Sequence, residues 1–372
     1  MKAGGSGAGA VGFTVFRPAP HGIASQLLQL SHQAFLALVS RRVMIVDWHQ
    51  PFSVSNVIHP ADFDWDIDRA RRLVPDIDEL VSEAAGRECA AVSEEDRLQI
   101  ENGAKGTNMT FKESERSDFW GGLCALPTVH TGREVEAYVH KFLGGGDAVL
   151  CQHMTTTSGF NKILGLVKPG LAFDSPLMAN TTGMEIVAWM LRTLFRPSPV
   201  IAQRLTEDWG GVFRNYFVVG MHMRLGGVNG DTWAGYLDDI GIKTFFECAR
   251  QAGKQAEASQ SKPVAYIFVT DTAVVRQRAH QEFPHGSIYT TTSNVVHTAG
   301  PTAASNRQGV EDALYEWFLL ARSDDMIVNS VSSYGYTAAA MAGVLPITIA
   351  VGQTKCYRNA WKVTSYPGYI VK

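Results

Sequence analysis

Short apolar runs alternate with longer amphipathic segments through the second half of the chain. Runs rich in valine, isoleucine and phenylalanine predict buried strands, and apolar residues that recur every three or four positions predict helices. The expected strands lie at 215–224, 265–271, 287–292, 325–330 and 345–351. The expected helices lie at 233–256, 273–283, 309–322 and 334–343. This alternation predicts a doubly wound α/β domain, which binds its ligands at the carboxyl ends of the strands.

The first half opens with the same alternation. Residues 12–16 are expected to form a strand, 23–40 a helix with a broad apolar face, and 43–48 a second strand. Together these make a βαβ unit of a parallel sheet. A further helix is expected at 184–195, and a linker at 196–212, although part of that linker, 200–209, also has a helical pattern.

Composition and charge restrict the class of protein. The 372 residues suggest two domains or one large one, and a content of 45% hydrophobic and 19% charged residues is that of a globular chain. The formal net charge is −3 without a long basic block, which argues against nucleic acid as a partner. The five cysteines include no CxxC, so no structural zinc site is expected, and their odd number leaves at least one unpaired within the chain.

Signals of cellular location point in two directions. The triplets that begin at Asn108 and Asn180 fit N-glycosylation in the lumen of the secretory pathway. No uncharged apolar run approaches 20 residues, so no membrane span is expected, and the first ten residues lack the apolar centre of a signal peptide. We expect either a cytoplasmic protein or one whose membrane anchor is absent from this chain.

Polar side chains follow three of the expected strands at the edge where such a sheet binds ligand. His222 and Arg224 end the first strand, Asp271 ends the second, and Ser332 and Ser333 follow the fourth. Arg224 offers forked donors suited to phosphate. Ser333 is expected at the N-cap of the next helix, whose free N–H groups favour an anion, and the Asp271 carboxylate can accept hydrogen bonds from a ribose or a base. Together these residues predict a site for a nucleotide that carries phosphate.

Each of these residues also has a structural interpretation. Arg224 has possible surface partners in Asp238 and Asp239, His222 fits a core histidine, and the serines and Asp271 fit the starts of helices. The sequence contains no P-loop, no GxGxxG between a strand and a helix and no GxSxG elbow. The DxD patterns within 62–68 fit a metal and nucleotide-diphosphate site, but we favour the acidic start of a helix, and no metal site is predicted.

Three ordered segments, HMR at 222–224, FVTD at 268–271 and SSYGY at 332–336, resemble the fucosyltransferase superfamily that uses GDP-fucose. That superfamily includes the α1,6-, the protein O- and the plant xyloglucan fucosyltransferases. The loop, helix and strand of 21–47 are similar to the same family in layout. The resemblance implies an α/β fold of the GT-B type, in which two Rossmann-like domains face a cleft. A flexible N-terminus and these two domains are then expected at residues 1–11, 12–205 and 206–372.

The resemblance also implies an activity: inverting, metal-independent transfer of fucose from GDP-fucose to a glycan hydroxyl. It implies no cofactor besides the donor substrate, a donor bound to the C-terminal domain, an acceptor bound to the N-terminal domain, and work in the Golgi or secretory-pathway lumen. Arg224 is expected to hold the diphosphate, His222 to lie against the nucleotide and Asp271 to contact guanosine. The full set of donor-binding residues carried over by position is His21, Gly22, His222, Arg224, Asp271, Glu316, Asp324, Ser332, Ser333 and Tyr334.

Two departures from the family pattern bear on catalysis. Leu225 follows Arg224 where many relatives have a second arginine, and Asp231 is the acid nearest to the arginine motif. Asp231 is therefore our candidate base, because a carboxylate within reach can take the proton of the acceptor hydroxyl. The alternative is a dissociative reaction in which Arg224 stabilises the leaving GDP. Trp48 and His49, at the end of the second strand, are the candidate acceptor residues.

Two other functions stay open at this stage. One is a transferase of the same fold that uses another nucleotide sugar. The other is a non-catalytic carbohydrate-binding relative, which the missing second arginine and the uncertain base suggest. The sequence predicts neither the acceptor nor the oligomeric state.

Overall fold

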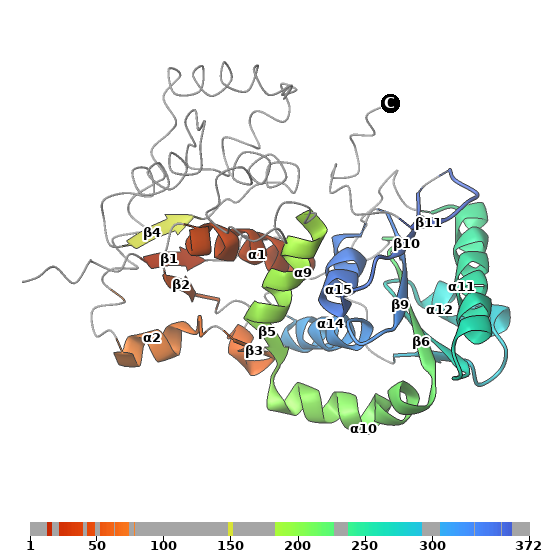
Figure 1. The fold of residues 1–372 in the computed structure, drawn as a ribbon, viewed down its shortest axis with the longest axis horizontal. Coiled ribbons are helices and arrows are strands. Elements are labelled where there is room, and N and C mark those ends of the chain that lie inside the picture. Colours follow the sequence, from red (N-terminus) through yellow and green to blue (C-terminus); the bar gives the residue numbers. More distant parts are fainter. Residues whose placement is uncertain are drawn as a thin grey trace, which may run out of the picture. The chain divides into compact units, whose positions relative to one another are not determined.

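A computed structural model shows the fold of the chain (Figure 1). It describes residues 13–16, 22–39, 43–48, 53–62, 64–73, 78, 148–151, 183–226, 237–291, 306–330, 332–350 and 352–358. Contacts divide the chain into two compact units. The first unit comprises Met1–Ala19, Gln29–Trp48 and Asp64–Thr181. The second comprises Pro20–Leu28, His49–Phe63 and Thr182–Lys372.

The described part of the first unit is built on a parallel sheet. Strand β1 (Phe13–Phe16) pairs in parallel with β2 (Val43–Val46) on one side and with β4 (Ala148–Cys151) on the other. Helix α1 (Ile23–Val39) connects β1 to β2 and buries Leu27 and Leu30 completely. The predicted βαβ unit is therefore confirmed.

The second unit contains a larger sheet. Its strands are β6 (Phe217–Met223), β7 (Val264–Thr270), β8 (Ile288–Thr290), β9 (Asp325–Asn329), β10 (Ile347–Ile349) and β11 (Tyr357–Arg358). Their order across the sheet is β11-β10-β9-β6-β7-β8. All pairs are parallel except β10 with β11. The chain thus proceeds from β6 to β8 on one side and then returns to lay β9 and β10 on the other, which makes the boundary between β6 and β9 the topological switch point.

Helices cover both faces of this sheet (Figure 1). Helices α11 (Asp239–Ser259) and α12 (Ala273–Glu282) pack on one face, where Val219, Met221 and Met223 of β6 join a fully apolar cluster. Helices α14 (Arg307–Leu320) and α15 (Ser333–Ala342) lie on the other face, toward which the alternate residues Gly220 and His222 point. The doubly wound prediction is confirmed, with most element ends within two residues of expectation. Helix α11 starts later than expected, at Asp239, because the Asp238 side chain caps it by accepting from Gly241 N at 2.7 Å.

Residues 196–212 do not form a linker between the two units, and the helical pattern noted at 200–209 is confirmed. Helix α9 (Gly183–Leu194) runs directly into β5 (Phe195–Pro197) and then into α10 (Pro199–Asn215). The proline-rich segment is a helix start: Ser198 accepts from Ile201 N at 3.4 Å, and Pro199 stands at the first helical position, where a missing N–H costs nothing. The predicted domain boundary between residues 205 and 206 falls inside α10, and the roles assigned to the two domains stay predictions.

Strands β3 and β5 were not anticipated, and neither was β11. Strand β3 (Ile58–Pro60), which follows the 3-10 turn Val54–Asn56, pairs antiparallel with β5. The acidic stretch after it precedes α2 (Ile67–Leu73), where the Asp66 carboxylate accepts from Asp68 N at 2.9 Å. The favoured interpretation of this stretch, acidic residues at a helix start, therefore describes the structure.

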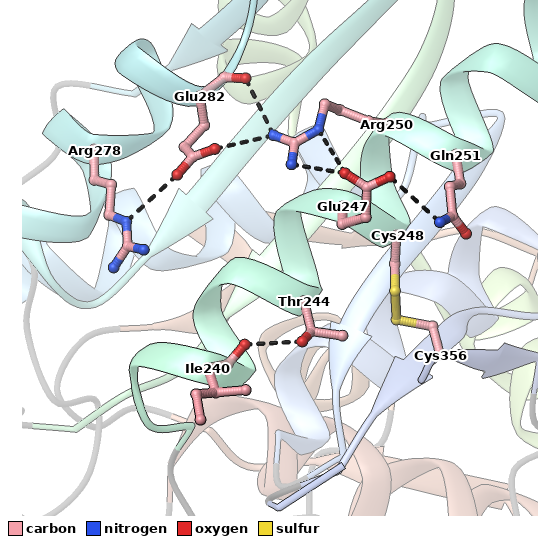
Figure 2. A network of polar contacts seen from close by, with 9 residues as sticks. All are labelled: Ile240, Thr244, Glu247, Cys248, Arg250, Gln251, Arg278, Glu282 and Cys356. Atoms are coloured by element: carbon pink, nitrogen blue, oxygen red, sulfur yellow. Dashed lines mark hydrogen bonds and ion pairs between the residues drawn. A yellow bond between two sulfur atoms is a disulfide. The ribbon is translucent and has the colours of Figure 1, made fainter. Parts of the chain in front are cut away.

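Helix α11 is linked to two other segments, to α12 by an ion pair and to the chain before β11 by a disulfide (Figure 2). Arg250 donates to Glu247 on its own helix at 2.8 Å and to Glu282 of α12 at 3.1 Å. A disulfide joins Cys248 to Cys356, just before β11, with their Cα atoms 6.2 Å apart. The sequence alone indicated no pairing between these two cysteines, which are 108 residues apart. None of the described helices is both long and apolar enough to cross a membrane.

Candidate functional site

The switch point of the larger sheet is marked by a reciprocal pair of hydrogen bonds. Asn329, the last residue of β9, is completely buried. Its side chain accepts from Arg224 N at 3.1 Å and donates from Nδ2 to Arg224 O at 2.7 Å. These two bonds bind both main-chain polar groups of Arg224, which directly follows β6. The position of Arg224 is thus fixed at the carboxyl edge, as the sequence predicted.

Asp271, directly after β7, holds the next two residues of the same loop. Its Oδ1 accepts from Leu225 N and its Oδ2 from Gly226 N, each at 2.8 Å. The Arg224 guanidinium forms an ion pair with Oδ2 at 3.7 Å. Asp238 and Asp239, the alternative surface partners of Arg224, are engaged elsewhere: Asp238 caps α11, and Asp239 forms an ion pair with Arg278. Strands β6, β7 and β9 thus meet around one loop.

His222 is buried beneath this loop, against the start of α15. Its ring centroid lies 4.8 Å from that of Tyr334, and its Nδ1 has no hydrogen-bond partner among the described residues. Burial lowers the pKa of His222 to about 3, with a further contribution from the charge of Arg224. His222 is therefore neutral at physiological pH.

Close approach between α15 and the sheet depends on Gly335. A Cβ at this position would lie 2.7 Å from Val328 Cγ1 and 3.0 Å from His222 Nδ1. Real Cβ atoms do not come so close to another side chain, so a residue without Cβ is required here. The SSYGY segment therefore brings the amino end of a helix directly over the carboxyl ends of β6 and β9.

The amino end of α15 has an unusual N-cap. Ser332, not Ser333 as expected, is the N-cap residue, and Ser333 is the first residue of the helix. The Ser332 side chain makes no capping hydrogen bond, is only 2% exposed, and its Oγ has no partner among the described residues. Because an ordinary N-cap serine bonds to a free N–H of the first turn, the first-turn N–H groups here are left for another acceptor.

Tyr334 and Glu316 lie in the layer between α14 and α15. The Tyr334 hydroxyl donates to Ala313 O, and the Thr291 hydroxyl donates to Glu316. Burial, assisted by the charge of Glu316, raises the pKa of Tyr334 well above its usual value. Both side chains are thus engaged by the protein itself, although each lies near the carboxyl edge.

Asp324 is a described donor candidate that the structure does not bring to this edge. It precedes β9, and its carboxylate accepts from Val218 N, at the start of β6, at 2.8 Å. Its own N–H donates to Val218 O at 2.9 Å. Since β6 runs from there to Arg224, at about 3.3 Å per residue, Asp324 is at the amino edge, roughly 20 Å from Arg224.

The remaining predicted residues belong to the first half of the chain or to segments outside the description. Gly22 immediately precedes α1, and its carbonyl accepts from Ser25 N at 2.9 Å. Trp48 is 3% exposed and packs on Phe16 with ring centroids 6.3 Å apart, so it offers little surface to a sugar ring. The described residues include no group of three or more potential metal ligands of the His, Cys, Asp and Glu types. His21, His49 and Asp231 lie outside the described residues.

Asn329 was missed by the sequence analysis. The signal that could have found it is the one that found Asp271: a polar side chain at the last position of an apolar strand. The predicted strand at 325–330 extends one residue past Asn329, so Asn329 did not stand out as a strand end.

A mainly parallel sheet in the order observed, with its switch point between β6 and β9, is typical of the Rossmann-like class of α/β proteins. No protein-family model and no curated protein sequence matches the chain. Solved structures do. A mutant of Arabidopsis thaliana FUT1 in complex with GDP matches with a TM-score of 0.51 and 13% identity, over 92% of this chain and 71% of that one.

Two further structures are similar. POFUT1 in complex with GDP has a TM-score of 0.51 and 10% identity, over 93% of this chain and 99% of that one. Fucosyltransferase NodZ from Bradyrhizobium has a TM-score of 0.49 and 16% identity, over 94% of this chain and 99% of that one. The likeness to FUT1 and POFUT1 confirms the predicted fold, an α/β fold of the GT-B type like that of GDP-fucose-dependent fucosyltransferases. At such identities it is evidence of the fold alone.

Proposed function

We propose that this protein is a glycosyltransferase that moves fucose from GDP-fucose to a hydroxyl group of a glycan. The observation that supports the proposal most is the anion-binding character of the switch point. Arg224 follows β6 there and α15 begins at the same edge of the sheet, beside two buried atoms without partners among the described residues, Ser332 Oγ and His222 Nδ1. A guanidinium and free helical N–H groups both favour a phosphate. The structures of similar fold contain GDP.

In the proposed reaction the acceptor oxygen attacks the anomeric carbon of fucose as the bond to the GDP phosphate breaks. Negative charge then grows on the leaving diphosphate, where Arg224 stabilises it. Attack from the face opposite the leaving group inverts the anomeric configuration. Asp231 takes the proton of the acceptor hydroxyl, and no metal takes part. The donor binds to the C-terminal domain, and the N-terminal domain binds the acceptor.

The proposed compartment is the lumen of the secretory pathway. The disulfide between Cys248 and Cys356 supports this assignment, because such bonds persist in oxidising compartments and are rare in the cytosol. Peptide mapping of the protein isolated from its native cell, without reduction, tests this step. Free thiols at both positions would favour the cytoplasmic alternative.

Replacement of Arg224 tests the site directly. We expect Arg224→Ala to lower kcat by about 10²–10³-fold, as removal of one charge-stabilising donor typically does, and Arg224→Lys to restore only part of the rate because lysine lacks the planar fork. The fold should persist, since the Asn329 side chain bonds to the main chain of Arg224 and not to its guanidinium. Arg278→Ala, which removes an arginine that pairs with Asp239 on the outer surface, is the matched control. Full activity of the Arg224→Ala protein would disprove the assignment.

Calorimetry with GDP, UDP and ADP tests the donor class, and GDP-fucose against GDP-mannose tests the sugar. We expect GDP to bind most tightly, transfer to occur from GDP-fucose, and EDTA to leave the rate unchanged. Preference for UDP would indicate another nucleotide sugar, and a strict requirement for manganese would contradict the metal-free reaction.

For the base, Asp231→Asn should abolish the acidic limb of the pH–rate profile.

A further inference from the structure

The protein itself occupies most of the acceptor positions of the Asp271 carboxylate. Oδ1 accepts from Leu225 N at 2.8 Å and from the Thr272 hydroxyl at 3.2 Å. Oδ2 accepts from Gly226 N at 2.8 Å and lies 3.7 Å from the Arg224 guanidinium. A carboxylate has about four lone-pair sites. Three hydrogen bonds and one ion pair with protein groups therefore engage this carboxylate, so the protein already uses most of its acceptor capacity.

Asn329 completes the restraint from the opposite strand. Its amide matches the N–H and the C=O of Arg224 at once, through the 3.1 Å and 2.7 Å bonds. The four main-chain groups bound by these two side chains belong to three consecutive residues. Gly226, at the end of this stretch, has a φ of 72°, a left-handed conformation in which the chain turns away from β6.

We infer that Asp271 and Asn329 are positioning residues: they clamp the main chain of residues 224–226 from β7 and β9, so that Arg224 faces the ligand edge, and Asp271 does not read the nucleotide base. The role in transfer rests on the proposed function. This role differs from the guanosine contact that the family resemblance implied for Asp271. The clamp also gives Asn329 a role, which the sequence did not indicate.

Two isosteric variants test the clamp. Asn329→Asp keeps an acceptor for Arg224 N but places a second carboxylate oxygen against Arg224 O. Asp271→Asn keeps the volume but replaces one acceptor by an NH₂ group that faces a main-chain N–H. Thr348→Val is the matched control, because it removes a hydrogen bond from a completely buried side chain of the same sheet, to Tyr357 O, that does not touch the loop.

Amide hydrogen exchange provides a readout that is independent of activity. We expect the amides of Arg224, Leu225 and Gly226 to exchange at least tenfold faster in both clamp variants and at the wild-type rate in Thr348→Val. In transfer assays we expect kcat to fall about 10²-fold in the clamp variants, with a smaller change in KM, since misplacing a charge-stabilising group acts mainly on the transition state. Unchanged exchange at all three amides would overturn the clamp.

Binding of GDP and IDP separates a clamp from a base reader. IDP lacks the 2-amino group of guanine. Loss of a carboxylate that bonds to guanine would therefore weaken the binding of GDP more than the binding of IDP. We expect Asp271→Asn to weaken the binding of GDP and of IDP by the same factor. A larger loss of affinity for GDP than for IDP would overturn the inference. If the wild-type protein binds no nucleotide and transfers no sugar, the proposed function fails, while the amide exchange result still decides the clamp.

Discussion

His222 combines deep burial with a ring nitrogen that has no partner among the described residues. The groups that face it are the Tyr334 ring from α15 and, along its own strand, the cation of Arg224. Neither offers the negative charge that would stabilise an imidazolium. The folded protein therefore holds this ring neutral, and the unfolded chain does not, which links His222 to the pH dependence of stability.

The sign of that dependence follows from the two pKa values. His222 titrates near 6.5 when unfolded and near 3 when folded. Between these pH values only the unfolded chain binds the proton, so the free energy of unfolding decreases as the pH falls through 6.5. The decrease attributable to His222 is about 2 kcal/mol between pH 7 and pH 5. Urea unfolding at both pH values should show this decrease, and His222→Gln should remove it.

The exposed His280, changed to Gln in the same way, is the control for this measurement. If the His222→Gln protein lost as much stability between pH 7 and pH 5 as the wild type, the assignment of a buried neutral imidazole would be wrong.

Among the elements, α15 shows most clearly how one small residue decides packing. Gly335→Ala places a methyl group within 2.7 Å of Val328 Cγ1, so α15 must move away from β9. We expect a loss of about 1–3 kcal/mol of stability, the usual cost of overpacking a core, and weaker GDP binding because the helix amino end moves. Thermal unfolding and calorimetry measure the two effects.

Gly211→Ala is the matched control for that substitution. Gly211 lies in the interior of α10, and nothing lies within 4 Å of a Cβ built there. The same change should therefore stabilise the protein by up to about 1 kcal/mol, because alanine favours a helix over glycine. If both variants were stabilised, Gly335 would not be a close-packing position.

The elements also show what the sequence could predict. The apolar runs at 218–223 and 264–270 are buried along their whole length, so their composition alone indicated central parallel strands. Strands β3 and β5 could not be predicted, because each has three residues and their pairing depends on a partner about 137 positions away in the chain. The linker prediction failed because Ser198 and Pro199, which end the preceding element, are also the N-cap and the first residue of α10.

The sequence predicted the position of a residue in the sheet where its place along a strand decides that position, and it did not predict the partners of the side chains. Arg224 and Asp271 follow strands that the pattern placed correctly, so their edge of the sheet could be predicted. The role of Asp271 depends on two main-chain N–H groups that only the folded loop presents. Asp324 differs from Asp271 in that it precedes its strand, and a motif alignment does not weigh that difference.

For the molecule as a whole, the disulfide between Cys248 and Cys356 links segments that are far apart in the chain. It joins α11 to the segment before β11 and closes a loop of 108 residues that contains β7, β8, β9 and β10. A cross-link of this length restricts the unfolded chain strongly. We expect Cys248→Ser with Cys356→Ser to lower the free energy of unfolding by about 2–5 kcal/mol.

Chemical denaturation with and without reductant measures this effect. Reductant should lower the stability of the wild-type protein by a similar amount and leave the double variant unchanged. If mass spectrometry found both cysteines as free thiols in the oxidised protein, the predicted loss would have no basis.

The reciprocal bonds between Arg224 and Asn329 join residues 105 positions apart, and this separation bears on synthesis. Ribosomes add about 5–20 residues per second, so Arg224 waits roughly 5–20 s for its partner strand to be made. During that interval β6 has β7 beside it but lacks β9, and its other edge is open to wrong pairing. Nascent chains arrested before residue 325 should therefore bind chaperones strongly and GDP not at all, and both properties should reverse once β9 has emerged.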